Sequence, residues 1–180
     1  DRLTYGELKR RVDAVACSLM RLGLEKGDRV AIWSQNNVEW LLTQYATAKA
    51  GLVLVNINPA YRRAELEYAI NKVGCRALIL SPAFKTSNYI EMVEDLAPEL
   101  KSAAPGALKA AKLPTLQWVI RMGDARTPGM LNFGELLTPP NHDEKESLAK
   151  LGATLKADEP INIQFTSGTT GMPKGATLTH

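Results

Sequence analysis

Cysteine and histidine are scarce in this sequence, which contains two residues of each type among 180. Cys17 and Cys75 stand alone, outside any paired-cysteine spacing, so neither a disulfide framework nor a zinc site is indicated, as suits a reducing compartment. His142 and His180 lie far in sequence from Cys17, which leaves that thiol without an evident partner for nucleophilic catalysis. Both cysteines are therefore predicted to be small buried hydrophobic residues.

The sequence also lacks a large excess of positive or negative charge. The formal net charge is +3, and no run of Lys and Arg is longer than three residues. The small basic patch of Arg62 and Arg63, next to Tyr61, is typical of a solvated turn before a helix. The sequence thus lacks the basic footprint of a nucleic-acid-binding protein, and no nucleic-acid partner is expected.

A long uninterrupted apolar run is the third absence. Residues 38–57 are mostly apolar, but Glu39, Lys49 and Gly51 interrupt them. A buried helix followed by a buried strand explains this stretch better than a transmembrane segment, so none is expected.

Helical periodicity is clearest near the start of the chain. Apolar residues recur at helical spacing over 8–22 and Gly23 ends the pattern. Thr4 and Glu7 have the spacing of a capping box, in which Thr4 accepts from a first-turn N–H and Glu7 reaches back. Further helices are predicted over 38–50, 63–72, 87–96 and 143–155.

Strands are predicted between these helices, over 30–33, 52–55, 77–80, 116–120, 161–165 and 176–179. The continuous apolar run at 52–55 is typical of a parallel strand covered on both faces. Loops are expected over 123–134 and 138–141, and a loop or a weak helix over 103–113. The alternation predicts an α/β fold, a mostly parallel sheet flanked by helices on both faces.

Several aromatic residues are interpreted as packing residues of the core or of a sheet face: Trp33, Trp40, Tyr45 and Trp118. Stacking of one of them on an adenine is the alternative, and packing is favoured. His142, beside two prolines, is predicted to lie in a surface loop.

Residues 166–175 have the composition of a phosphate-binding loop. They contain four hydroxyl side chains, three glycines and one lysine. Glycines let backbone N–H groups turn toward an anion, hydroxyls donate to phosphoryl oxygens, and Lys174 supplies a positive charge. A flexible surface turn is the alternative explanation, but the ten-residue run is too specific for it to be preferred.

This loop differs from the two common nucleotide-binding patterns. Counting from Gly168, a Walker A motif would need glycine where Pro173 stands, and a hydroxyl residue after Lys174 where Gly175 stands. The glycine spacing does not fit a dinucleotide fingerprint either. The flanking patterns predict a strand–loop–strand, ending in the Gly/Thr-rich loop and a short second strand, without a helix behind the phosphate site.

The run from Thr166 to Gly175 resembles, without a gap, the phosphate-binding signature of the adenylate-forming (AMP-binding) superfamily. Residues 3–8, 26–30 and 48–51 are also similar to that superfamily. The stretch from Asn58 through 68 resembles its fatty acyl-CoA synthetase branch. The resemblance covers essentially the whole chain, but only the first part of a family member.

The resemblance implies an acid–thiol ligase (acyl-CoA synthetase, AMP-forming) that acts on a medium-chain fatty acid with ATP, Mg²⁺ and CoA. An acyl-adenylate and pyrophosphate form first, and acyl-CoA and AMP follow. It also implies the mitochondrial matrix as the compartment. Residues 1–180 would be part of the N-terminal adenylation domain, with the C-terminal domain absent and the rest of the same polypeptide as a partner. This segment alone is expected to be inactive.

The expected ATP- and phosphate-binding residues are Thr166, Ser167, Gly168, Thr169, Thr170, Gly171, Pro173, Lys174 and Gly175. The hydroxyls and Lys174 would contact phosphates, the glycines would allow close backbone approach, and Pro173 would restrict the loop. His180 is a candidate for the acyl or adenylate pocket, with a structural histidine at a strand end as the alternative. No catalytic residue or metal ligand is assigned within this segment.

Two other functions remain open. An adenylation domain that delivers its acyl group to a carrier protein, or to another acceptor, would share the same loop. A truncated module that binds nucleotide or a protein partner without chemistry would expose apolar surface where the rest of the domain should dock.

Overall fold

The structure, a computed structural model, describes residues 2–166 and 173–179. The helices are α1 (Tyr5–Arg21), α2 (Val38–Lys49), α3 (Arg63–Val73), α4 (Tyr89–Leu96) and α5 (His142–Gly152), with the 3-10 helices η1 (Pro98–Lys101) and η2 (Phe133–Leu137). The strands are β1 (Arg29–Trp33), β2 (Val53–Asn56), β3 (Cys75–Leu80), β4 (Ala83–Phe84), β5 (Ser87–Asn88), β6 (Trp118–Arg121), β7 (Leu131–Asn132), β8 (Asn162–Thr166) and β9 (Lys174–Leu178).

The described residues form a seven-stranded sheet in the order β7-β6-β3-β1-β2-β8-β9. Every neighbouring pair is parallel except β8 and β9, which run antiparallel. Val30 lies opposite Leu54, and Ala31 lies opposite Leu78, so the apolar runs of three strands meet at the centre of the sheet. The predicted α/β class with a mostly parallel sheet is confirmed.

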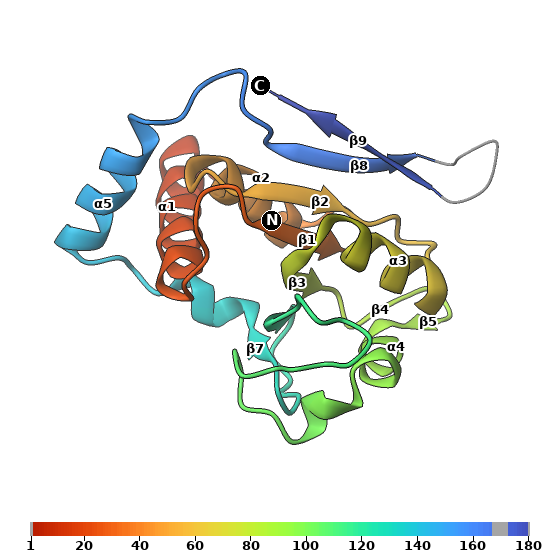
Figure 1. Cartoon of the computed structure of the whole chain (residues 1–180). Coiled ribbons are helices and arrows are strands. Elements are labelled where there is room, and N and C mark those ends of the chain that lie inside the picture. The colour runs from red at the N-terminus through yellow and green to blue at the C-terminus, as the bar shows by residue number, and fades with distance from the viewer. Residues whose placement is uncertain (1, 167–172, 180) are drawn as a thin grey trace.

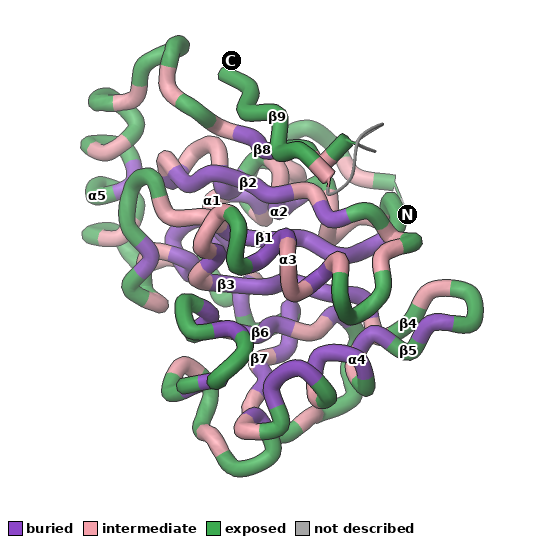
Figure 2. Tube along the Cα trace, turned by 45° about the vertical axis from the view of Figure 1, so that its right-hand side comes forward, coloured by how far each residue is buried: buried purple, intermediate pink, exposed green. Residues whose placement is uncertain are grey.

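Helices cover both faces of the central strands (Figures 1 and 2). On one face α1, α2, η2 and α5 contribute to a buried cluster that includes Leu19, Leu42 and Leu148. On the other face α3 and α4 contribute Ile70 and Met92 to a second cluster. Because residues along a strand alternate between faces, β1 supplies both clusters and its interior is fully enclosed.

The first helix begins where its sequence indicates. The Thr4 side chain accepts from the backbone N–H of Glu7 at 3.2 Å, as expected. The second half of the predicted capping box is wrong, because the Glu7 carboxylate accepts from Arg11 at 2.7 Å. The Glu7 side chain thus pairs with Arg11, one turn later in the helix, instead of accepting from the backbone N–H of Thr4.

The start of α5 corrects the interpretation of His142 as a loop residue. His142 is the first residue of the helix and is exposed. The Asn141 side chain accepts from the Glu144 N–H, and the Glu144 carboxylate accepts from the Asn141 N–H, both at 2.9 Å. This reciprocal cap starts the helix one residue earlier than its apolar pattern predicted.

Short elements account for the other differences. The predicted 123–134 loop contains β7 and the start of η2. The helix predicted over 87–96 begins at Tyr89, because Ser87 and Asn88 pair with β4 in a hairpin and the Asn88 side chain caps the helix. Tyr45 is 51% exposed, so its assignment to the core was wrong, whereas Trp33 is fully buried.

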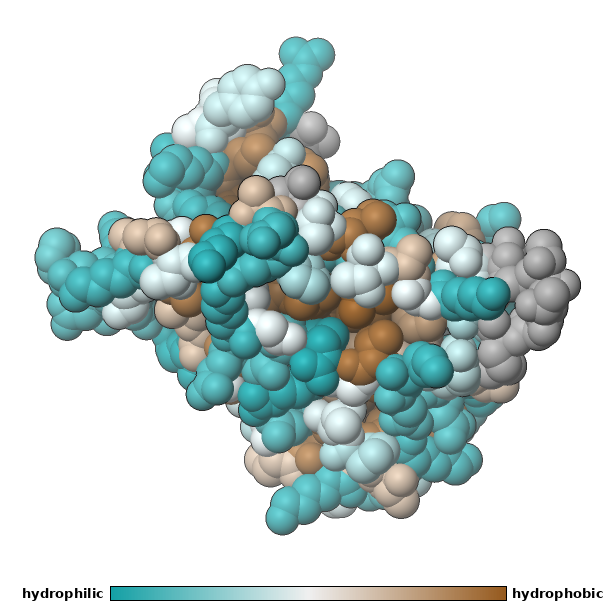
Figure 3. Space-filling model, turned by 45° about the horizontal axis from the view of Figure 1, so that its top comes forward, coloured by the Kyte–Doolittle hydropathy of each residue, from teal (hydrophilic) through white to brown (hydrophobic). Residues whose placement is uncertain are grey.

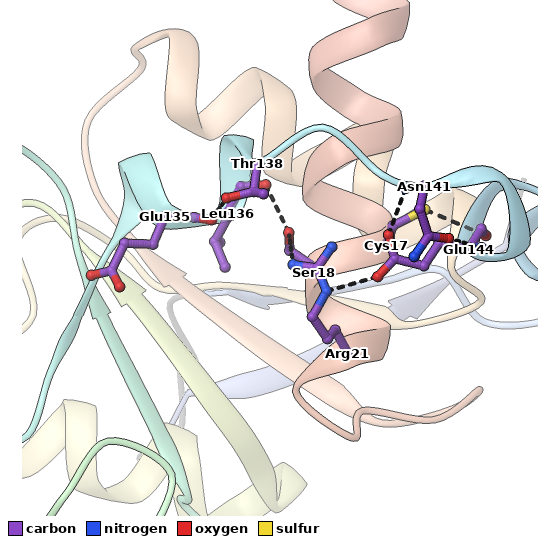
Figure 4. A network of polar contacts seen from close by, with 8 residues as sticks. All are labelled: Cys17, Ser18, Arg21, Glu135, Leu136, Thr138, Asn141 and Glu144. Carbon is purple, nitrogen blue, oxygen red and sulfur yellow. Dashed lines mark hydrogen bonds and ion pairs between the residues drawn. The ribbon is translucent and has the colours of Figure 1, made fainter.

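Polar contacts fasten the 135–144 segment to α1 (Figure 4). Arg21 donates to the Glu144 carboxylate at 2.8 Å, and the Ser18 hydroxyl donates to the Leu136 carbonyl at 2.9 Å. Together they hold η2 and α5 against the same helix. None of the described helices combines the length and the apolar composition needed to cross a membrane.

Candidate functional site

The sequence motif lies at one edge of the sheet. Strands β1, β2, β3, β6 and β8 are parallel, so their carboxyl ends share that edge. The chain leaves the carboxyl end of β8 into the motif and returns as β9 (Figure 1). Ligands of open parallel sheets bind outside the carboxyl ends of the strands. The two predicted strands that flank the motif are confirmed, with the second beginning at Lys174, and their motif ends lie where such a sheet binds ligands.

Thr166 and Lys174 are brought together at the mouth of this turn. They are directly opposite each other in the antiparallel pair, and both are exposed. The Thr166 hydroxyl donates to the Lys174 carbonyl at 3.4 Å. Directly paired residues project from the same face of a sheet, so the hydroxyl and the ammonium group lie on one side of the hairpin. Lys174 can therefore present a positive charge to an anion here, and the Thr166 hydroxyl can donate to the same anion if it releases the Lys174 carbonyl.

Gly175 lies in β9 opposite Phe165 rather than in the turn itself. A methyl group at Gly175 would lie 3.1 Å from Ile163 Cγ2 and 3.6 Å from the Phe165 ring. That ring packs edge-on against Tyr68, with centroids 6.4 Å apart. The structure therefore gives this glycine a packing reason, in addition to the backbone approach expected from the sequence. Pro173 precedes the strand and is half-buried.

The other predicted site residues lie outside the described residues: Ser167, Gly168, Thr169, Thr170, Gly171 and His180. The described part of the motif therefore consists of its two flanks.

Three amides that the sequence did not single out lie behind the hairpin. Asn56 donates to the Asn162 side chain at 3.2 Å, and Asn162 donates to the Gln44 side chain at 3.4 Å. These contacts tie the start of β8 to β2 and α2. In the described part of the chain the buried Asn56 Oδ1 has no hydrogen-bond partner. The signal in the sequence was an asparagine at the end of an apolar strand.

An aromatic pair supports the turn after β2. Trp33 and Tyr89 stack with ring centroids 3.7 Å apart. Trp33 donates to the Asn58 carbonyl at 3.2 Å and the Tyr89 hydroxyl donates to the Pro59 carbonyl at 2.5 Å. Burial raises the pKa of Tyr89 to about 12, so it remains a donor at physiological pH. Packing, as favoured from the sequence, is confirmed for Trp33.

A basic cleft of about 450 Å³ lies at the carboxyl ends of β3 and β6, beside the β4–β5 hairpin. Lys85, at a positive φ of 51°, and Arg121 contribute its cations. Arg121 donates to Thr127 at 2.8 Å, while its buried Nε has no hydrogen-bond partner among the described residues. This cleft can accept an anionic group at the edge that carries the motif. The sequence did not indicate this cleft, because its two cations, Lys85 and Arg121, are far apart along the chain.

The two thiols are buried, as predicted. Burial raises the pKa of Cys75 to about 12. Burial also raises the pKa of Cys17, assisted by Glu144. Neither thiol has the depressed pKa of a nucleophile.

Curated proteins similar to this chain are acyl-CoA ligases by name. The mitochondrial medium-chain acyl-CoA ligase ACSF2 of Bos taurus is 48% identical over 182 residues, covering 99% of this chain and 29% of the relative. The putative acyl-CoA synthetase YngI of Bacillus subtilis (strain 168) is 40% identical, covering 99% of this chain and 33% of the relative. The chain therefore spans a third or less of the length of these relatives.

Solved structures share the fold. Acetoacetyl-CoA synthetase from Streptomyces lividans matches with a TM-score of 0.79 at 24% identity, covering 99% of this chain and 26% of that one. The anthranilate CoA ligase AuaEII, in complex with anthranoyl-AMP, matches with a TM-score of 0.77 at 21% identity, covering 99% of this chain and 30% of that one. At these identities the likeness shows the fold alone.

The sequence pattern of the AMP-binding enzyme family matches residues 1–180, which is the whole of this chain. The resemblance carried by the motif is thereby confirmed, and the chain belongs to the AMP-binding enzyme family.

Proposed function

We propose that the polypeptide carrying this chain is an AMP-forming acid–thiol ligase that converts a medium-chain fatty acid to its CoA thioester. The names of its relatives support this reaction and substrate class. Because the chain spans 29% of the ACSF2 relative from Bos taurus, the activity belongs to the longer polypeptide. Residues 1–180 then form part of an N-terminal adenylation domain, and a C-terminal domain would lie in the remainder.

The observation that carries this proposal is the position of the motif. The run from Thr166 to Gly175 begins at the end of β8 and ends in β9, and these two described ends lie at the carboxyl edge of the parallel sheet. Thr166 and Lys174 project from the same face of the hairpin there. A hydroxyl, a cation and glycine backbone at such an edge suit a polyphosphate better than an uncharged substrate.

In the first step, a fatty-acid carboxylate oxygen bonds to the α-phosphorus of ATP, and the bond to the departing pyrophosphate breaks. Negative charge accumulates on that pyrophosphate. Lys174 and the hydroxyls of Thr166, Ser167, Thr169 and Thr170 would stabilise it, with the backbone of Gly168 and Gly171 allowing close approach. Besides the fatty acid, the proposed substrates of the reaction are ATP and CoA.

In the second step, the CoA sulfur bonds to the acyl carbon and AMP leaves. His180 is proposed to lie near the acyl or adenylate pocket. Both steps depend on positioning of the reactants, which a pre-formed sheet edge favours.

Mg²⁺ is proposed as a companion of ATP. No three His, Cys, Asp or Glu side chains gather into a metal-binding group within residues 2–166 and 173–179. Mg²⁺ commonly binds through substrate phosphates and few protein carboxylates. No step is therefore assigned to a metal held by the described residues.

The compartment is proposed to be the mitochondrial matrix. The ACSF2 relatives of Bos taurus and Homo sapiens are named as mitochondrial proteins, which supports this proposal.

The test uses the full-length polypeptide with octanoate, ATP and CoA, and measures pyrophosphate and thioester separately. Lys174→Ala should lower the rate of pyrophosphate release about a hundredfold or more, because a charge at the leaving group is lost. Lys150→Ala is the matched control, since Lys150 pairs with Glu146 on the surface of α5. Equal rates for both variants and the parent would contradict the proposal.

Residues 1–180 alone should release no pyrophosphate above background under the same conditions. Thioester formation by this segment at a rate near that of the full-length polypeptide would overturn the domain assignment.

A further inference from the structure

A second concave site lies between α1, α2 and α5, and α1 and α5 are at the opposite side of the molecule from the carboxyl end of β8 (Figure 1). It is a groove of about 590 Å³. That volume is within the range of about 300–1,000 Å³ that is typical of small-molecule sites. Its lining residues are Lys9, Asp13, Tyr45, Ala48, Lys49, Lys145, Leu148, Ala149, Gly152 and Leu155.

The charged residues of the groove are unbalanced. Asp13 is its one carboxylate, and it is shared by Lys9, at 2.8 Å, and by Lys49. Burial acts to raise the pKa of Asp13, but hydrogen bonds from Lys49 and Lys9 outweigh it and lower that pKa, so the carboxylate stays ionised. Lys145 takes part in none of the ion pairs among the described residues. Three cations thus face one anion.

The walls of the groove are apolar and partly open. Leu148 is buried and Leu155 is half-buried, while Ala48 and Ala149 are small. A Cβ at Gly152 would meet nothing within 4 Å, so this glycine leaves free space at the end of α5. An apolar trough with excess positive charge complements an amphiphile with one apolar chain and an anionic head.

The donors in the groove discriminate among anions. Its walls are three helices, whose interior backbone N–H groups are used within each helix, and Leu155 after α5, whose N–H donates to the Gly152 carbonyl. Only side-chain ammonium groups and the Tyr45 hydroxyl remain to bind an anion. This donor set lacks the glycine-rich backbone cradle of a polyphosphate site and suits a carboxylate on an aliphatic chain.

We propose that this groove binds a fatty-acid anion, with its carboxylate at Lys49 and Lys145 and its chain against Leu148 and Leu155. The site is distinct from the β8–β9 turn, and the inference does not rest on the proposed ligase function. Each additional methylene group of the ligand should tighten binding about fourfold until the groove is filled.

The test is photo-crosslinking of the full-length polypeptide, without ATP, to decanoate that carries a diazirine on its chain. Mass spectrometry should locate crosslinks on α1, α2 or α5. Excess decanoate should abolish them, and decanol should compete at least threefold less well, because it lacks the charge. Lys145→Gln should weaken labelling of these helices about threefold.

Gly152→Trp should fill the groove and abolish labelling there, since open space receives the new side chain. Gly134→Trp is its matched control, because a Cβ at Gly134 also meets nothing within 4 Å and Gly134 does not line the groove. Circular dichroism of each variant checks folding.

Absence of crosslinks on these helices, or equal competition by decanol, would overturn the inference. So would unchanged labelling in Gly152→Trp. Groove labelling that persists when Lys174→Ala abolishes pyrophosphate release would show that this site and the proposed ligase site are separate.

Discussion

The central strands and the β8–β9 hairpin belong to one sheet but are covered very differently. In β3 the residues from Ala77 to Leu80 are all fully buried. In β9 every residue is exposed, and Leu178 retains 45% of its surface. Figure 2 shows the contrast along the trace, and Figure 3 shows brown apolar surface interspersed with polar side chains on the side of the hairpin.

The difference separates the buried scaffold from the hairpin that carries the proposed phosphate-binding residues. Burial of apolar surface on both faces stabilises the central strands. The described part of the motif is attached to that scaffold through the pairing of β8 with β2 and β9. Functional segments are commonly drawn from the less stable parts of a fold. Mutations in the central strands should therefore affect stability more than activity, and mutations in the hairpin should affect activity more than stability.

A matched pair of leucine truncations gives the largest expected contrast. Leu78→Ala in β3 should lower the free energy of unfolding by about 2–5 kcal/mol, through lost burial and a residual cavity. Leu178→Ala in β9 should change it by no more than about 0.5 kcal/mol. Urea denaturation of the chain measures both. Similar losses would mean that the hairpin is part of the stabilising core after all.

Glycines give the next contrast. Gly129 has a φ of +72°, and a Cβ there would lie 2.2 Å from the Leu100 carbonyl oxygen, so Gly129→Ala should cost more than about 2 kcal/mol. Gly175 has no positive φ, and its nearest obstacle is Ile163 Cγ2 at 3.1 Å. Gly175→Ala should therefore change the free energy of unfolding by about 1 kcal/mol or less. Thermal and urea unfolding of the two variants provide the comparison, which would fail if Gly175→Ala were the more damaging.

The sequence itself carried this contrast in its patterns. The continuous apolar run at 52–55 predicted a doubly covered strand, whereas the alternation at 161–165 predicted a half-buried one. The burial of β2 agrees with its expectation, whereas β8 agrees only from Ile163 onward, because the polar Asn162 is also buried. Periodicity was informative because each of these segments is long enough to show it.

Where periodicity was absent, prediction failed. The strands β4, β5 and β7 have two residues each, which is too short for any pattern. Tyr45 is exposed because it lies on the side of α2 that faces the groove with α1 and α5. Composition alone could not place it.

For the candidate site, the sequence suggested a type of chemistry, which stays a prediction, but it did not indicate the contacts around it. Residues 166–175 indicated a phosphate loop through composition. Asn162 forms side-chain hydrogen bonds with Asn56 and Gln44, which both lie more than a hundred residues earlier in the chain. The basic cleft likewise combines Lys85 and Arg121 from separate segments. Such contacts depend on strand order and register, which a single sequence does not specify.

A smaller effect is expected at the aromatic support of the β2 turn. Tyr89→Phe removes the hydroxyl that donates to Pro59 and leaves that carbonyl without this donor. The loss should be about 1 kcal/mol in the free energy of unfolding. Tyr5→Phe is the control, because Tyr5 is 93% exposed. Equal urea midpoints for both variants would show that the scaffold does not depend on this contact.

The smallest expected effect concerns the ion pair of Arg21 in α1 with Glu144 in α5, and this effect depends on pH. The hydrogen bond from Arg21, assisted by the Asn141 N–H, lowers the pKa of Glu144 below its usual 4.5. A depressed folded-state pKa contributes stability above the unfolded-state pKa, and that contribution is lost as the pH falls through the folded-state value. Glu144→Gln should therefore flatten the decline in the free energy of unfolding between about pH 5 and about pH 3.

The pairing partner provides the decisive control for this effect. In an Arg21→Ala background, Glu144→Gln should flatten the acid decline much less, because the main cause of the lowered pKa is already gone. Glu146→Gln removes a carboxylate from the same helix without touching α1, since Glu146 pairs with Lys150. If Glu144→Gln acted equally in both backgrounds, α5 would not be held to the scaffold through Arg21. The Arg21–Glu144 ion pair would then contribute as little to the free energy of unfolding as the exposed hairpin does.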